Sequence, residues 1–264
     1  MDKNMDVVIL CGGMGTRLKE ETDVKPKPMV EIGGKPILWH IMKYYSHFGY
    51  HRFILALGYK GEVIKKHFFD YGFLSGDLTI ALDPKVPPKV HSLSDEKHWE
   101  VTCVDTGLNT LKGGRVKRLE PYIKSGDFHL TYGDGLGAVD LDELVRFHAK
   151  HGRVGTVTAV RPPSRFGELC LKGDTVTEFE EKPQLSTGHI NGGFFVFKKR
   201  IMDYLAAGEN CDLEFGPLNK LAKEKELMAY KHDGYWQCMD NVRDMEYLNK
   251  LWETGEPPWK VWDK

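Results

Sequence analysis

The chain has 264 residues, and its 37 Lys and Arg nearly balance its 38 Asp and Glu, which gives a formal net charge of −1. This balance excludes a general nucleic-acid coat protein, because such a protein needs a basic excess to neutralise phosphates. Hydrophobic residues at 41% and charged residues at 28% exclude a disordered chain. The 28 glycines exceed the usual share of about 7% and gather in short clusters.

Targeting and redox signals are weak along the whole chain. No apolar run approaches the roughly 18 residues that a membrane-spanning helix needs. Residues 1–6 are too few and too acidic for a signal peptide. The five cysteines are widely spaced and form no Cys-x-x-Cys pair, so we expect reduced thiols rather than a disulfide or zinc framework. These features predict a cytoplasmic protein with no membrane contact.

The first half of the chain alternates between strand and helix patterns. The expected elements, in order, are a buried strand at 7–11, a helix from Pro36 to Gly49, a strand at 53–57, a helix at 62–70, a strand at 128–132 and a helix at 141–150. Strands that alternate with helices indicate βαβ units and a parallel sheet. Residues 83–98 contain three prolines and are expected to form an insertion or lid.

The pattern changes after about residue 152. Strands are expected at 154–160, 168–171, 175–179 and 194–197, and helices at 200–207, 214–224 and 241–252. No internal repeat is evident. We therefore predict one domain over residues 1–264, with an α/β nucleotide-binding half at 1–152 packed closely against a mixed half at 153–264.

A glycine-rich turn follows the first strand. It contains Gly12, Gly13 and Gly15, and such a turn can direct backbone N–H groups at an anion. It is not a P-loop, because Thr16 and Arg17 stand where Lys and Ser or Thr are required, and Leu18 replaces the third glycine of the dinucleotide fingerprint. The turn alone is as compatible with a structural role as with a phosphate site.

Three cations near the glycine turn favour a phosphate site over a purely structural turn. Arg17 follows the glycine turn at once, and Lys25 and Lys27 alternate with Pro26 and Pro28 a few residues later. Arg can grip two phosphate oxygens, Lys acts as a point charge, and the prolines limit the entropy lost on binding. The alternative is a solvated basic loop.

An aspartate follows the strand at 128–132. Asp134 lies between Gly133 and Gly135, where the carboxyl end of a parallel strand would place it beside a ligand. It is a candidate Mg²⁺ ligand, although Asp is also a common turn residue. Asp240 is the leading candidate for a second carboxylate.

Motifs over nearly the whole chain resemble those of the sugar-1-phosphate nucleotidyltransferases. The matching segments are 12–18, 25–29, 33–42, 105–107, 113–115, 132–135, 165–167, 181–183, 191–195 and 235–237. The resemblance implies a Rossmann-like, mixed but mainly parallel sheet flanked by helices, with a smaller mixed sugar-binding part. Within the family, these motifs are most similar to the cytidylyltransferase branch, from which the chain departs at Lys112, Cys238 and Asn241.

The resemblance also implies roles for individual residues. Catalysis would fall to Arg17 and Lys27, and Asp134 and Asp240 would bind Mg²⁺. The nucleotide would be bound by Leu10, Gly12, Gly13, Met14, Gly15, Thr16, Arg17, Lys25, Thr106, Arg115 and Gly133. The sugar phosphate would be framed by Gly167, Glu181, Lys182, Asn191 and Gly192.

The implied reaction joins CTP and α-D-glucose 1-phosphate to give CDP-glucose and pyrophosphate, catalysed by a homo-oligomer. One alternative within the family uses another nucleotide, such as UTP or dTTP, or another activated phosphate. A second alternative is a nucleotide-binding regulator without catalysis. An NAD-dependent oxidoreductase is a third, which Leu18 disfavours.

Overall fold

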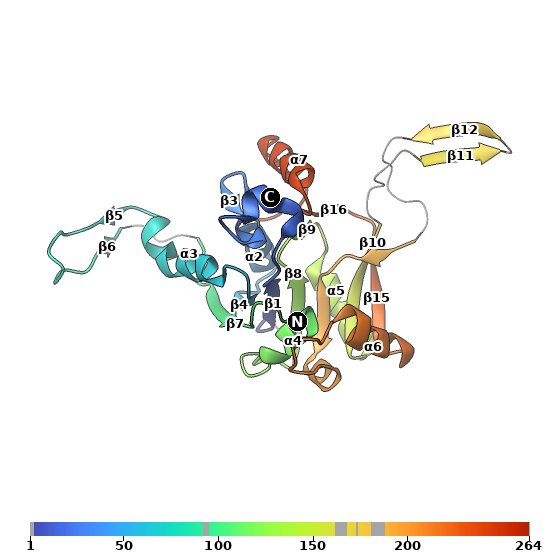
Figure 1. Cartoon of the computed structure of the whole chain (residues 1–264), viewed down its shortest axis with the longest axis horizontal. Coiled ribbons are helices and arrows are strands. Elements are labelled where there is room, and N and C mark those ends of the chain that lie inside the picture. Colours follow the sequence, from blue (N-terminus) through green and yellow to red (C-terminus); the bar gives the residue numbers. More distant parts are fainter. Residues whose placement is uncertain (1–2, 92–94, 162–167, 173, 181–187, 264) are drawn as a thin grey trace.

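The computed structural model describes residues 3–91, 95–161, 168–172, 174–180 and 188–263. Its centre is an eight-stranded sheet in the order β13-β10-β14-β8-β1-β4-β7, with β15 paired to β10 (Figure 1). The strands are β1 (Asp6–Cys11), β4 (Arg52–Leu57), β7 (Glu100–Asp105), β8 (Asp127–Tyr132), β10 (Gly155–Val160), β13 (Ile190–Asn191), β14 (Phe195–Lys198) and β15 (Leu227–His232).

The sheet is mixed but mainly parallel, as predicted. Strands β8, β1, β4 and β7 run parallel to one another, and β10 is parallel to β15. Strand β14 is antiparallel to both β8 and β10, so it joins strands from the two halves of the chain. The carboxyl ends of β1, β4, β7 and β8 therefore lie along one edge of the sheet, which is where α/β proteins bind ligands.

Helices cover both faces of the sheet. They are α1 (Lys19–Thr22), α2 (Ile37–His47), α3 (Gly61–Leu74), α4 (Lys112–Arg118), α5 (Leu141–His151), α6 (Asn219–Lys223) and α7 (Val242–Glu253). Side chains of β1 alternate between the faces: Val7 and Ile9 pack in the cluster with α2 and α5, while Val8 and Leu10 pack in the cluster with α4 and α6. Burial on both faces explains the continuous apolar run of this strand.

Several elements were not expected from the sequence, among them β7, α4 and β15. The glycines of α4 conceal it, because glycine is a poor helix former. Close packing explains why glycines stand in this helix. A Cβ at Gly113 would lie 2.7 Å from Cys211 Sγ, and one at Gly114 would lie 2.4 Å from the Gly208 carbonyl oxygen. The helix expected at 200–207 is a 3₁₀ helix over Lys199–Tyr204, and the one at 214–224 begins as a π-helical turn over Glu214–Leu218.

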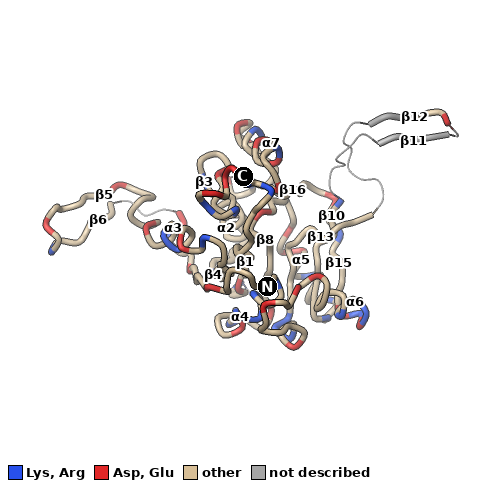
Figure 2. Tube along the Cα trace, viewed as in Figure 1, with Lys and Arg blue, Asp and Glu red and all other residues tan. Residues whose placement is uncertain are grey.

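Four two-stranded hairpins and ribbons decorate the sheet. They are β2 (Glu31–Ile32) with β3 (Lys35–Pro36), β5 (Leu78–Thr79) with β6 (Lys89–Val90), β9 (Gly135–Gly137) with β16 (Trp236–Cys238), and β11 (Glu168–Lys172) with β12 (Thr175–Glu180). The β5–β6 arm extends away from the sheet, and much of the expected insertion at 83–98 lies on it (Figure 1). Lys and Arg occur alongside Asp and Glu over the sheet, the helices and this arm (Figure 2).

Candidate active site

A pocket of about 570 Å³ opens at the carboxyl ends of β1 and β8. Many of the residues expected at the site line it together, namely Leu10, Gly12, Gly13, Gly15, Thr16, Arg17, Lys27, Arg115, Gly133, Asp134, Asn191 and Asp240. The strand order explains this convergence, because β1 is hydrogen-bonded to β8 along its length and each strand delivers its following loop to the same edge.

Four expected site residues lie outside the lining, and three lie outside the described residues. Met14 is exposed on the glycine turn, and Lys25 pairs with Glu21 at 3.4 Å. The Thr106 hydroxyl is buried and donates to the Leu57 carbonyl oxygen at 2.6 Å, and the Gly192 carbonyl accepts from the Trp236 indole at 2.7 Å. Gly167, Glu181 and Lys182 belong to the segments that the structure does not describe.

The glycine turn is held in shape by Arg115. Its guanidinium donates to the carbonyl oxygens of Gly12, Leu57, Gly107 and Leu108, and to the Thr106 hydroxyl, over 2.7–3.1 Å. A Cβ at Gly12 would lie 2.2 Å from the guanidinium, so only glycine permits this approach. Burial lowers the pKa of Arg115 from its ordinary value, and the neighbouring Arg118 adds to the effect. Arg115 thus ties together the loops after β1, β4 and β7.

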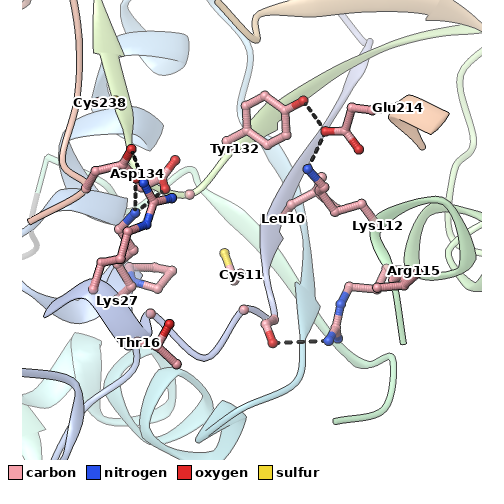
Figure 3. A pocket seen from close by; sticks show the side chains of 18 of the residues that line it. Leu10, Cys11, Thr16, Lys27, Lys112, Arg115, Tyr132, Asp134, Glu214 and Cys238 are labelled. Atoms are coloured by element: carbon pink, nitrogen blue, oxygen red, sulfur yellow. Dashed lines mark hydrogen bonds and ion pairs between the residues drawn. The ribbon is translucent and has the colours of Figure 1, made fainter. Parts of the chain in front are cut away.

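Lys27 connects the two candidate metal ligands. Its Nζ lies 2.5 Å from Asp134 Oδ2 and 3.0 Å from Asp240 Oδ1, and Arg17 Nη1 lies 2.9 Å from Asp240 Oδ2. Figure 3 shows Lys27 and Asp134 close together in the pocket. The Lys27 side chain is only 12% exposed. Its burial acts to lower its pKa, but the charge and hydrogen bond of Asp134, with those of Asp240, outweigh burial and raise the pKa. The ammonium group therefore stays charged.

Local structure fixes each member of this cluster. Lys27 begins a 3₁₀ helix, Lys27–Met29, whose backbone is constrained by Pro26 and Pro28. The strand pair β9–β16 brings Asp134 and Asp240 together, because the Met239 N–H donates to the Asp134 carbonyl oxygen at 2.9 Å. Asp240 then immediately precedes the capping box of α7, and its N–H donates to Asp244 Oδ2 at 2.8 Å.

The donor set matches the expected Mg²⁺. Two carboxylates from separate strand ends converge on one ammonium group, which shows that the site between them accepts a cation. Magnesium commonly takes one or two carboxylates and completes its shell with phosphate and water oxygens. Within the described residues, no group of three or more His, Cys, Asp or Glu is arranged to hold a metal, so substrate phosphates would have to contribute.

A second polar cluster in the pocket was not expected from the sequence. Glu214 accepts hydrogen bonds from Lys112 and from the Tyr132 hydroxyl (Figure 3). The Tyr132 hydroxyl in turn accepts from Asn191 Nδ2. Tyr132 could have been suspected, because it directly precedes Gly133 and Asp134. Glu214 carries no local signal, because it comes from a turn far along the chain and reaches the pocket only through the tertiary fold.

The chain is similar to known nucleotidyl transferases over most of its length. The family model described as nucleotidyl transferase matches residues 6–250. Glucose-1-phosphate cytidylyltransferase of Salmonella typhimurium is 49% identical over 98% of this chain and 100% of its own length. A probable glucose-1-phosphate cytidylyltransferase of Bacillus subtilis is 45% identical, with the same coverage of both chains.

Solved structures agree on the fold. HddC from Yersinia pseudotuberculosis is similar with a TM-score of 0.66 and 26% identity, over 94% of this chain and 99% of its own. An apo UDP-glucose pyrophosphorylase has a TM-score of 0.68 at 15% identity, over 96% of this chain and 99% of its own. Nowhere in the described residues does a helix combine the length and apolarity that a membrane span requires. Because this family model matches residues 6–250, which is nearly the whole chain, the chain belongs to the nucleotidyl transferases.

Proposed function

We propose that the chain is a glucose-1-phosphate cytidylyltransferase, which converts CTP and α-D-glucose 1-phosphate into CDP-glucose and pyrophosphate. The observation that carries this proposal is the 49% identity to the Salmonella typhimurium enzyme along essentially the full length of both chains. The pocket supports the proposal, because its lining includes Lys27 and Arg17 beside the glycine turn. The lining also includes the second polar cluster, in which Lys112 pairs with Glu214.

The chemistry needs charge compensation rather than a general base. A phosphate oxygen of the sugar phosphate attacks the α-phosphorus of the nucleotide in line, and pyrophosphate leaves. The nucleophile is already an anion, so the main obstacle is repulsion between two anions. Lys27 and Arg17, which lie beside the glycine turn, would reduce this repulsion and stabilise charge on the α-phosphate and the leaving group.

Asp134 and Asp240 would hold Mg²⁺ in this proposal. A bound Mg²⁺ supplies Lewis-acid stabilisation to phosphate oxygens. In the described structure the two carboxylates instead neutralise Lys27 and Arg17. Their transfer to a metal would free both cations for the phosphates. The homo-oligomer stays a prediction from the resemblance, and the cytoplasmic location stays a prediction from the sequence features.

A substrate panel tests the proposal. Purified protein is incubated with each of CTP, UTP, dTTP and GTP, paired with glucose 1-phosphate or mannose 1-phosphate, and pyrophosphate release is measured. We expect the highest kcat/KM for CTP with glucose 1-phosphate. Preference for another pair would contradict the assigned substrates, and no turnover with any pair would favour a nucleotide-binding regulator.

A further inference from the structure

The second polar cluster of the pocket has fixed hydrogen-bond directions. A carboxylate only accepts and an amide nitrogen only donates. The Tyr132 hydroxyl therefore donates its single proton to Glu214 Oε1 at 2.8 Å and accepts from Asn191 Nδ2, also at 2.8 Å.

The orientation of the Asn191 amide is fixed independently. The Gly193 N–H can only donate, and it lies 2.9 Å from Asn191 Oδ1, which identifies the oxygen end of the amide. The turn that presents Asn191 is constrained, because Gly193 and Phe194 both have positive φ angles, of 75° and 44°. One N–H of the amide is thus committed to Tyr132, while the other is left for a ligand in the pocket that Asn191 lines.

The charge of this cluster favours a neutral ligand group. Glu214 is a carboxylate in a pocket for anions, and alone it would repel phosphates. Lys112 pairs with it, and Lys112 Nζ also lies 5.3 Å from the centre of the Tyr132 ring. The Lys112–Glu214 pair makes this part of the pocket lining polar but neutral. Such a lining is better matched to sugar hydroxyls than to phosphate oxygens.

We infer that Glu214 is a positioning residue for sugar recognition: through Tyr132 it holds the Asn191 amide for a sugar hydroxyl, and Lys112 neutralises its charge. This inference rests on the proposed function for the sugar-phosphate substrate, but not on which sugar or nucleotide is used. Glu214 and Lys112 need not touch the reacting atoms. Their effect should fall on KM for the sugar phosphate and on sugar selectivity.

Two variants and a matched control test the inference. Tyr132→Phe removes the linking hydroxyl, and Glu214→Ala removes the acceptor of its hydrogen bond. Tyr204→Phe is the control, because Tyr204 donates an equally long 2.8 Å bond to Glu224 Oε2 outside the pocket. Each variant is assayed with the best substrate pair of the wild type, and the melting temperature is recorded.

For both pocket variants we expect KM for the sugar phosphate to rise roughly tenfold, as for one lost hydrogen bond. KM for the nucleotide should stay within about twofold, since Lys27 and the glycine turn are untouched. The ratio of kcat/KM for glucose 1-phosphate to kcat/KM for its epimer galactose 1-phosphate should fall by a similar factor. Tyr204→Phe should change none of these quantities.

The double variant separates positioning from independent effects. If Glu214 acts through Tyr132, adding Glu214→Ala to Tyr132→Phe changes the sugar-phosphate KM little further. Fully additive effects, equal rises in both KM values, or unchanged selectivity would overturn the inference. A wild type that prefers another substrate pair would overturn the proposed function alone, because the same comparison then runs with that pair. Failure of the wild type to bind any sugar phosphate in calorimetry would overturn both.

Discussion

Asp134 and Asp240 follow different strands, yet their carboxylates contact one shared ammonium group, with Lys27 Nζ at 2.5 Å and 3.0 Å respectively. The pairing of β9 with β16 brings the two aspartates together. The cluster therefore neutralises the Lys27 ammonium group beside the glycine turn. In the proposed function, an anionic substrate and a metal would compete for its members. Four predictions follow from this arrangement and from the packing that supports it.

Replacement of Lys27 by alanine should lower kcat by about 10² to 10³, because one preorganised charge beside the reacting phosphates is lost. The fold should survive, because the change shortens one side chain at the pocket and leaves the backbone of the 3₁₀ helix Lys27–Met29 unaltered. Steady-state kinetics and a melting curve check both statements. Lys223→Ala, at an exposed position on α6, is the control and should behave as wild type. A near-normal kcat for Lys27→Ala would remove this residue from the catalytic machinery.

Asp134→Asn should raise the Mg²⁺ concentration needed for half-maximal activity by at least about tenfold, because a neutral amide is a poorer Mg²⁺ ligand than a carboxylate. The measurement is a Mg²⁺ titration of activity after chelation with EDTA. Asp203→Asn changes an exposed carboxylate on the 3₁₀ helix and should leave the titration unchanged. Superimposable curves for Asp134→Asn and wild type would contradict the metal role.

The turn between β2 and β3 offers a matched pair of glycines. Both have positive φ, which costs about 1–2 kcal/mol for an alanine, but their surroundings differ. A Cβ at Gly33 would lie 2.0 Å from the Trp252 ring of α7, whereas one at Gly34 meets nothing within 4 Å. Gly33→Ala should therefore lower the melting temperature more than Gly34→Ala. Gly33→Ala should also raise the Mg²⁺ concentration needed for half-maximal activity, because α7 begins just after Asp240. Equal stability of the two variants would contradict this packing argument.

The acid stability of the protein should depend on Asp240. Burial acts to raise its pKa, but the hydrogen bond and charge of Lys27, with the charge of Arg17, outweigh burial and lower it. A lowered pKa contributes stability above the unfolded value of about 3.9 and loses it as the pH falls through the folded value. Urea unfolding should thus show wild type more stable than Asp240→Asn between about pH 5 and 8, with the difference shrinking below about pH 4. A difference that is constant down to pH 3 would contradict the coupling.

Local sequence determined much of the frame and the cationic loop. The apolar runs of β1, β4 and β8 and the amphipathic α2, α5 and α7 were predicted close to their observed bounds, because burial imposes a residue pattern within each element. Edge strand β7 and the glycine-bearing α4 were missed. Their formation depends on neighbours, namely β4 for the strand and the segment near Gly208 and Cys211 for the helix.

The sequence by itself determined which residue types surround the glycine turn, and with them the family to which the chain belongs. Only the tertiary structure decided which of those residues meet. It placed Asp240 beside Asp134 against Lys27, turned Arg115 toward backbone carbonyls, and brought Glu214 to Tyr132. The reason is physical: charge pairs and hydrogen bonds act over a few ångströms, and strand order alone decides which distant segments come within that range.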